Sequence, residues 1–590
     1  MRYLKKAMMT ALAAALVLGS TARVAHAVCG DANGNGAVDI GDALNLAGKI
    51  AANGDNHACP GAPYVQADCD VLDVLKDGKV STSDLTNLVD QIAGVKTLYA
   101  ACTGPGPIVS CTDGSDSDVG VRSPLPIHTI PAGTITSNQT WPDGCVIDLT
   151  GIVYVASGVV VKLQPGAIVK GIGAGTTNPA VLIFLPGSKI DAQGTPQKPI
   201  IMTSGQPTGS RSIGDWGGLL LNGKSTVNRP NCINTAEGIP APYGGCDATD
   251  SSGILTYARI EFSGIEFTPN NELNVTTLNG VGNQTKIEHL QSNSGGDDCT
   301  EWFGGTVNVK YFVSSACADD QFDWQLGTTG ARQYGIGIQF GPFLQVGAQS
   351  RGIEADNSEF GFDDLPRSNP LFCNITNIGA KDNDVNIGSD GGWFFRRGTA
   401  GLVANGIAAN WASGCIKIND PQTYQWACTD GTHLKTSDPF LLVENSQCYH
   451  NGSNNTTQIA QSGTGGLCSP TQLYGLWNTN TNHQVQPADG NEGDNPGFPI
   501  TWASAVVGHG YCKSTPDADG KCNAVGAGSS TLPDFRPTMT MTAQPTDCSK
   551  IDGYFEKTNY LGAFEPGGSN WLDTGFGTDS YTRWISFDTN

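Results

Sequence analysis

Two acidic, aromatic stretches of the sequence repeat at a spacing of 22 residues. Residues 285–305 read TKIEHLQSNSGGDDCTEWFGG, and residues 307–327 read VNVKYFVSSACADDQFDWQLG. An alignment without a gap matches Asp297, Asp298, Glu301 and Trp302 to Asp319, Asp320, Asp323 and Trp324. Charges of one sign repel, so carboxylates that are brought together need solvent, a shared proton or a bound cation.

Three interpretations of these carboxylates remain open. They can accept backbone N–H groups at turns, or they can bind Ca²⁺, which takes flexible sets of oxygen ligands. They can also be catalytic, because glycoside hydrolysis uses a carboxylic acid paired with a carboxylate base. The candidate catalytic residues are Asp297, Asp298, Asp319 and Asp320. Glu354, Asp356 and Asn357, in RGIEADN, either extend the same face or form a second cluster.

Near the N-terminus, a 12-residue loop has the spacing of a calcium site. Position 6 is Gly36, which allows the sharp turn, and the oxygen-bearing residues at positions 1, 3, 5, 9 and 12 are Asp31, Asn33, Asn35, Asp39 and Asp42. A second copy has Asp73, Asp77, Ser81 and Asp84 at positions 1, 5, 9 and 12. In that copy Leu75 occupies position 3 and cannot supply a side-chain ligand.

Each loop precedes a stretch with helical apolar spacing, and together the two units resemble a dockerin or EF-hand-like domain over residues 28–95. The resemblance implies that Ca²⁺ is bound. It also implies either a cohesin-like partner or an internal packing role for the domain.

Residues 1–27 have the pattern of a secretion signal, with MRYLKK followed by an apolar run and an Ala-His-Ala site. We therefore expect a secreted or cell-surface protein with no transmembrane segment, because no later apolar run is long enough to span a bilayer. The 18 cysteines suit disulfides in an oxidising compartment, and no paired CxxC units suggest zinc. A formal charge of −22 argues against nucleic-acid binding.

The rest of the chain is predicted to be mainly β. Residues 96–140, rich in Gly, Pro and Ser, are expected to be a linker before a domain at 141–590. LQPGAIVKG (163–171) and FLPGSKIDA (184–192) align at a spacing of 21. Together with the 22-residue acidic repeat, this spacing favours a right-handed parallel β-helix with three strands per rung. A β-propeller, whose blades need longer repeats, is the alternative.

Several phrases make this domain similar to secreted bacterial β-helix proteins of the pectin-lyase-like superfamily. They are GDWGGLLLNG (214–223), YARIEFSGIE (257–266), the acidic repeat and RGIEADN (351–357). SGGDDC also resembles the aspartate motif of polygalacturonases, but His509 of the GHG motif lies more than 200 residues further on. The resemblance implies the fold and assigns no activity.

Two functions from different classes follow from these patterns. The first is a calcium-binding extracellular protein that binds carbohydrate or has a structural role. The second is a polysaccharide lyase or glycoside hydrolase. A lyase would need an Arg or Lys base beside the calcium, and Arg351, Arg396 and Arg397 are available, although their spacing does not select one of them.

Overall fold

The computed structural model describes residues 106–449 apart from 174–176, 178, 269–270, 345–348 and 381–388. It also describes parts of 459–487, residue 536, and the segments 545–572 and 580–587. Before residue 106, it describes only Leu46 and the antiparallel pair β1 (His57–Ala58) and β2 (Lys79–Val80). The calcium-loop residues predicted between Asp31 and Asp84 therefore lie outside the described residues. The chain divides into two compact units, Met1–Gly104 and Pro105–Asn590.

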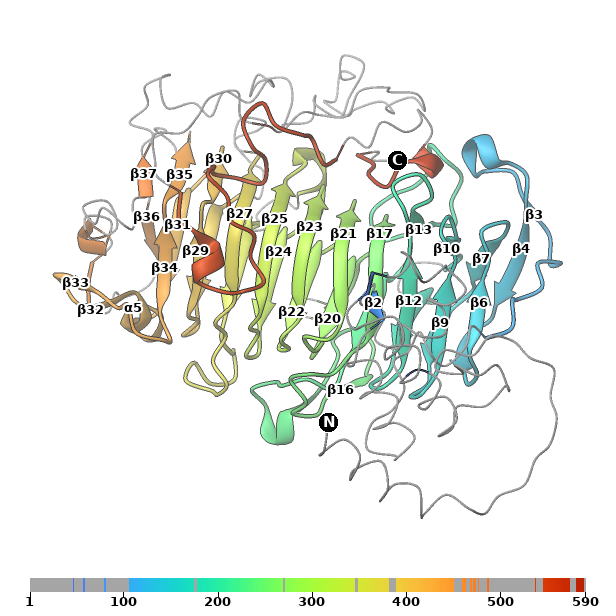
Figure 1. The fold of residues 1–590 in the computed structure, drawn as a ribbon, viewed down its shortest axis with the longest axis horizontal. Helices are drawn as coiled ribbons and strands as arrows, with labels where there is room; N and C mark the ends of the chain where they lie inside the picture. Colours follow the sequence, from blue (N-terminus) through green and yellow to red (C-terminus); the bar gives the residue numbers. More distant parts are fainter. Residues whose placement is uncertain are drawn as a thin grey trace. The chain divides into compact units, whose positions relative to one another are not determined.

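The second unit is built on two long parallel sheets whose strands stand side by side in Figure 1. One has 11 strands, and every strand between its two edges is hydrogen-bonded to the strand one coil earlier and the strand one coil later. These strands are β5 (Gly133–Ile135), β8 (Ile152–Val155), β11 (Val181–Phe184), β14 (Leu219–Asn222), β20 (Thr276–Asn279), β22 (Thr300–Phe303), β24 (Phe322–Gln325), β26 (Ile353–Asp356), β28 (Gly391–Arg396), β31 (Gly414–Asn419) and β36 (Ile459–Ser462).

The other sheet has 18 strands, which supply the remaining strands of each coil. Only the β3–β4 pair in it is antiparallel. Its strands are β3 (Ser115–Asp116), β4 (Leu125–Ile130), β6 (Gln139–Trp141), β7 (Val146–Leu149), β9 (Val160–Leu163), β10 (Ile168–Gly171), β12 (Lys189–Gln193), β13 (Ile200–Ser204), β17 (Gly253–Glu261), β21 (Lys286–Asn293), β23 (Asn308–Ser315), β25 (Ala331–Ile338), β27 (Leu371–Ile378), β29 (Gly401–Ala404), β30 (Ile407–Ala409), β34 (Leu441–Glu444), β35 (Ser446–Tyr449) and β37 (Val485–Pro487).

Each coil contains three strand segments, two of which fuse in the middle of the molecule. The first half of β17 pairs with β12 and its second half pairs with β13, so one long strand continues two short ones. A residue with a left-handed backbone bends the long strand between its halves, as Tyr257, His289, Tyr311 and Tyr334 do in β17, β21, β23 and β25. Their rings stack in sequence, with centroids 4.1, 4.6 and 4.8 Å apart.

Alternation along each strand directs apolar side chains into the coil. In β22 and β24, Trp302 and Trp324 are 1 % exposed and pack in the main core, whereas Glu301 and Asp323 point to the outer face. The two tryptophans are therefore core residues and do not form a surface for a ligand. The coil thus buries a long apolar column and leaves the outer face of the 11-stranded sheet available for polar side chains.

Two sequence expectations need correction. Residues 106–140 carry β3 to β6, which pair with β4, β7, β8 and β9, so the β-helix begins inside the expected linker. The 21-residue match between 163–171 and 184–192 is not a step of one coil. Ile168 pairs with Val146 and Ile201, while Lys189 pairs with Val160. The match arises because each strand follows a similar Pro-Gly turn.

Disulfides join segments that the coil brings together, as the cysteine count predicts. The six described bridges are Cys111–Cys145, Cys232–Cys246, Cys299–Cys317, Cys373–Cys548, Cys415–Cys448 and Cys428–Cys468. The third of these links the two acidic stretches directly. Among the described residues, no helix is long and apolar enough to cross a bilayer. Helix α5 (Pro421–Ala427) has seven residues.

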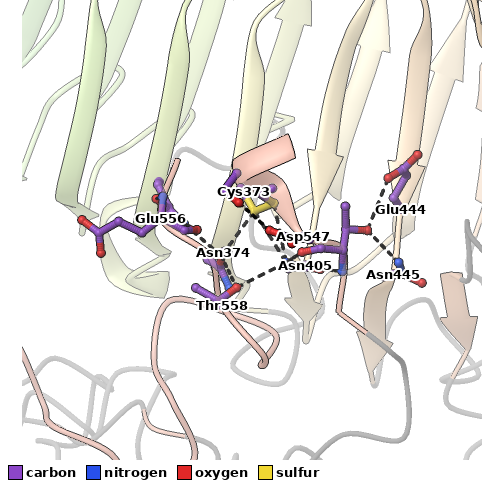
Figure 2. The surroundings of a disulfide bond; sticks show 12 residues. Cys373, Asn374, Asn405, Glu444, Asn445, Asp547, Glu556 and Thr558 are labelled. Carbon is purple, nitrogen blue, oxygen red and sulfur yellow. Dashed lines mark hydrogen bonds between the residues drawn. A yellow bond between two sulfur atoms is a disulfide. The ribbon is translucent and has the colours of Figure 1, made fainter. Parts of the chain in front are cut away.

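Residues 545–572 and 580–587 form a C-terminal strap that runs along the outer side of the 18-stranded sheet. Figure 2 shows its first anchor, where Cys548 is bonded to Cys373 and the Asn405 side chain exchanges two hydrogen bonds with the Thr546 backbone. Further on, the Glu556 backbone exchanges two hydrogen bonds with the Gln333 side chain. Apolar strap residues, among them Leu561, Phe564 and Trp584, cover an outward apolar patch of the sheet.

Candidate functional site

The two acidic stretches form successive turns that lead into β22 and β24. Glu301 pairs with Asp323 and Trp302 with Trp324, as the 22-residue alignment predicts. In the turns, the Asp320 backbone N–H donates to Asp298 Oδ1 at 2.8 Å, and the Asp319 N–H donates to the Asp297 carbonyl at 3.4 Å. The predicted stacking of acids over acids is therefore confirmed, and one aspartate also caps a turn.

The next rung adds a further carboxylate. Glu354 in β26 pairs with Asp323, so Glu301, Asp323 and Glu354 form one row across three neighbouring strands. Carboxylate oxygens gather in three trios, within each of which the oxygens lie within 4.8 Å of one another. The trios are Asp297, Asp298 and Asp319; Asp298, Glu301 and Asp323; and Asp320, Asp323 and Glu354.

Burial and mutual repulsion disfavour the charged forms of these groups. Burial raises the pKa of Asp297 well above its usual range, and the charge of Asp319 raises it further. The pKa of Asp298 is raised by burial and then by Asp297, and the pKa of Glu301 is raised by burial and then by Asp323. A cation would reverse these shifts, because an opposite charge favours the ionised carboxylate.

Arginines occupy the side of the site towards β28. Arg351 is 5 % exposed, contacts Glu354, and lies 3.5 Å from Asp320 and 3.4 Å from Asp390. Arg396 contacts Glu354 and pairs with Asp356 at 2.8 Å. The charges of the site are therefore graded, from unpaired carboxylates at β22 to paired carboxylates at β26.

Arg397 completes this basic side, pairing with the second oxygen of Asp356 at 2.8 Å. The Arg396 and Arg397 side chains are 24 % and 29 % exposed, so solvent reaches both. Burial lowers the pKa of Arg396 to about 10, and the neighbouring Arg397 and Arg351 charges contribute to the shift.

A cover built from two insertions, one on each side of β17, lies over part of the outer face beside the cluster. It contains the hairpins β15 (Ile233–Thr235)–β16 (Pro242–Gly244) and β18 (Ile265–Thr268)–β19 (Asn271–Leu273). Its apolar side chains pack on outward residues of β11, β14 and β22. It also brings two carboxylates near the site: Glu237 and Glu272 raise the pKa of Asp297, and burial raises the pKa of Glu237 itself to about 7.

The four candidate catalytic residues Asp297, Asp298, Asp319 and Asp320 all lie in this site, together with Glu354 and Arg351, whose place the spacing did not fix. Arg259, in the segment YARIEFSGIE, is not part of this site, because it lies in the other sheet and pairs with Glu261 at 2.8 Å. His509 lies outside the described residues. The site also includes buried Asn274, whose Nδ2 donates to Glu301 Oε2 at 2.5 Å. Sequence reasoning did not identify Asn274, Glu237 or Glu272, because no local motif marks them.

Comparison with known proteins places this architecture in context. The family described as "Pectate-lyase like beta helix domain" matches residues 133–477. Among solved structures, pectate lyase Pel9A is 10 % identical, with 69 % of this chain and 88 % of that chain covered and a TM-score of 0.30. The A-module of the mannuronan C-5 epimerase AlgE4 from Azotobacter vinelandii is 11 % identical, with 58 % and 87 % covered and a TM-score of 0.24. No curated protein matches the chain.

Proposed function

The chain belongs to the pectate-lyase-like β-helix domain family, and from this premise we propose that it is a secreted protein that binds acidic polysaccharide through calcium. The carbohydrate ligand is consistent with a family whose name refers to polysaccharide chemistry. The binding surface is the outer face of β22, β24, β26 and β28, where the carboxylates and arginines lie.

The observation that carries the proposal is the group of carboxylates without cationic partners. Among the described residues, Asp297, Asp298, Glu301, Asp319 and Asp323 make no ion pair with Lys, Arg or His within 4.0 Å. Several buried like charges are costly unless they are protonated or neutralised. Calcium suits such a site because it accepts six to eight oxygen ligands in flexible geometry.

The adjoining arginines favour an anionic sugar over a neutral one. Without a cation, the acidic rungs would repel a polyuronate, whereas a bound calcium can share its coordination sphere with a sugar carboxylate. Arg396, the last residue of β28, and Arg397, the next residue, lie two strands beyond β24 in the same sheet. Both side chains are partly exposed. Their guanidinium groups can donate hydrogen bonds to a second carboxylate of the same polymer.

A polysaccharide lyase is the second candidate, and the lowered pKa of Arg396 favours it. In β-elimination, a base removes the proton alpha to the uronate carboxylate, and the glycosidic C–O bond at the β position then breaks. A C=C bond remains, and the departing sugar oxygen takes up a proton from water. A calcium-bound carboxylate would stabilise the developing negative charge. An arginine whose pKa falls to about 10 loses its proton more readily than an ordinary one.

Binding and cleavage can be separated with the purified full-length protein. We expect polygalacturonate and alginate to be retained with Ca²⁺ and released by EDTA, and neutral glycans not to be retained. Asp298→Asn should lower retention at least tenfold, whereas Asp430→Asn, in the exposed β32 (Cys428–Asp430), should not change it. Ultraviolet absorbance from unsaturated ends would identify a lyase, and Arg396→Lys should then reduce it. Equal retention in EDTA would refute calcium-mediated binding.

We also propose that residues 1–27 direct export and that Asp31, Asn33, Asn35, Asp39 and Asp42 bind Ca²⁺ in a dockerin-like unit. The second loop, with Asp73, Asp77, Ser81 and Asp84, would bind a second ion, and a cohesin-like partner would dock there. Asp31→Asn with Asp73→Asn should remove part of the calcium-dependent melting shift. An unchanged shift would remove these loops from the proposal.

A further inference from the structure

A buried arginine inside the coil has no counter-charge. Arg332 belongs to β25, where it pairs with Val309 of β23 and Phe372 of β27 in a row of residues that points into the main core. Arg332 is 0 % exposed, and no carboxylate of the described residues forms an ion pair with it. Arginine is almost never fully buried without a partner, because a lone charge in an apolar interior is costly. The packing of the core therefore leaves one positive charge unexplained.

Several N–H groups at this place also lack acceptors. Nη1 of Arg332 donates to the carbonyl oxygens of Thr329 and Gly330 at 2.6 and 2.8 Å, whereas Nε and Nη2 have no hydrogen-bond partner. Trp302 is 1 % exposed, and its Nε1 is likewise buried without an acceptor. Arg332 Cζ lies 5.0 Å from the centroid of the Trp302 ring, so the two side chains are neighbours. Three donor nitrogens in one small region of the core are thus unpartnered, which is rare in the absence of a bound water or ion.

The aromatic rings around Arg332 compensate its charge only in part. Its guanidinium lies 5.0 and 5.5 Å from the ring centroids of Trp302 and Phe372, within the range of a cation–π attraction. These distances are longer than the 3.7 Å between the Arg229 guanidinium and the ring of Phe360, where the two groups are in direct contact. The rings therefore attract the charge but leave the hydrogen bonds of Arg332 unfilled.

A small anion meets both needs, because it neutralises the guanidinium and accepts several N–H groups at once. A water molecule brings no charge and needs acceptors for its own protons, and the carbonyl oxygens of Thr329 and Gly330 already accept Nη1. Burial lowers the pKa of Arg332 to about 9, and a bound anion would reverse this shift by favouring the charged form. A spherical halide suits the place better than an oxyanion, whose several oxygens would each need a donor.

We propose that Arg332 and Trp302 bind a halide ion inside the coil, with chloride as its ordinary occupant. Nε and Nη2 of Arg332 and Nε1 of Trp302 would donate to the ion. Because Trp302 belongs to β22 and Arg332 to β25, the ion would connect the two long sheets from within. This inference concerns the interior of the coil and depends on neither calcium nor carbohydrate binding.

The melting temperature of the full-length protein should depend on the chloride concentration. With Na⁺ and ionic strength held constant and gluconate as the replacing anion, Tm should rise by roughly 1–2 °C for each tenfold increase in chloride. Arg332→Met should fold and lose this dependence, because an apolar side chain of similar size can replace a buried charge. Arg211→Met is the control: Arg211 is also buried but pairs with Asp118 at 3.0 Å, so its loss should leave the chloride dependence unchanged. A Tm that is independent of chloride, or an equal dependence in Arg332→Met, would refute the halide site.

Bromide provides a direct readout of the ion. In crystals grown from protein refolded in sodium bromide, an anomalous difference peak should lie beside Arg332 Nη2 and Trp302 Nε1. Density there without an anomalous signal would identify a water molecule, and bromide peaks confined to the protein surface would indicate an adventitious ion only; either result would overturn the proposal.

The part played by the indole can be separated from that of the guanidinium. Trp302→Phe keeps an aromatic ring and removes one N–H donor, so roughly tenfold more chloride should be needed for the same rise in Tm above the variant's own value in gluconate. An unchanged chloride requirement would exclude Trp302 from the site.

Discussion

At the scale of single residues, Arg351 compensates much of the negative charge at the basic side of the site. It contacts carboxylates from three rungs, Asp320, Glu354 and Asp390, and its guanidinium lies over the ring of Phe394 at 4.6 Å. Arg351→Met should lower the free energy of unfolding by about 3–5 kcal/mol, because it leaves buried carboxylates unpaired. Urea unfolding at neutral pH measures the change.

The matched control is Arg397→Met. That side chain is 29 % exposed and bonds to Asp356, which keeps Arg396 as a partner, so the loss should be about 1 kcal/mol or less. Equal losses in the two variants would mean that the burial of Arg351 contributes nothing beyond a surface ion pair.

Asp148, in β7, is predicted to make stability depend on pH. Burial raises its pKa to about 6, the nearby Asp116 charge raises it further, and Lys170 opposes both effects. The folded state therefore binds the proton more tightly than the unfolded chain, so its stability falls as the pH rises from about 4 to about 6. Asp148→Asn should remove this contribution and stabilise the fold by on the order of 1 kcal/mol at pH 8.

The prediction for Asp148 is checked by comparing urea unfolding of the two proteins at pH 4 and pH 8. Other titrating groups contribute equally to both proteins, so the difference isolates this carboxyl group. A variant that is less stable than wild type at pH 8 would show that the Lys170 interaction outweighs the cost of burial.

At the scale of elements, the sequence predicts a rung only where successive coils have equal length. The 22-residue step from β21 to β23 and from β22 to β24 has no insertion, so aligned residues become neighbours. Elsewhere insertions lengthen the coil, so the residues that pair are more than 22 positions apart. Examples are Val160 with Lys189 and Phe322 with Ile353. The match at 21 residues failed because turn chemistry recurs with every strand, whereas pairing depends on the length of the whole coil.

The same reasoning explains which parts of the site were predictable. Asp297, Asp298, Asp319 and Asp320 lie in the evenly spaced coils, so their stacking followed from the alignment. Arg351 lies beyond an insertion, and its pairing with Asp320 required the three-dimensional path of the chain. Asn274 depends on the register of β20 with β22, which no repeated motif reveals.

The left-handed bend can be tested at Asn405, which lies between β29 and β30, the two strands that pair with the two halves of β27. Its φ of 54° is left-handed, which asparagine tolerates better than most residues, and its side chain holds both polar backbone groups of Thr546. Asn405→Ala should cost about 2–4 kcal/mol from strain and lost hydrogen bonds. Asn405→Gly, which keeps the bend without strain, should cost less in the same thermal unfolding assay. If glycine costs as much as alanine, backbone strain plays no part.

At the scale of the whole second unit, the strap connects coils that are far apart in the stack. It bonds to Glu444 at one end through Thr546, to Gln333 in the middle through Glu556, and to Gln291 through Ser586. Each coil of a solenoid otherwise contacts only its neighbours, so local opening would be easy. A strap that crosses many coils should make their unfolding cooperative.

The Cys373–Cys548 disulfide closes a loop with a sequence separation of 175 and fixes the start of the strap. Replacing both cysteines by alanine should cost about 4–5 kcal/mol through the greater entropy of the unfolded chain. The strap should then be cut by protease before residues 106–449, as mass spectrometry of timed digests would show. The control pair Cys232–Cys246 has a separation of only 14, so its removal should cost about 3 kcal/mol and leave the strap protected. Equal protection of the strap in both variants would mean that its hydrogen bonds and apolar contacts hold it without the covalent link.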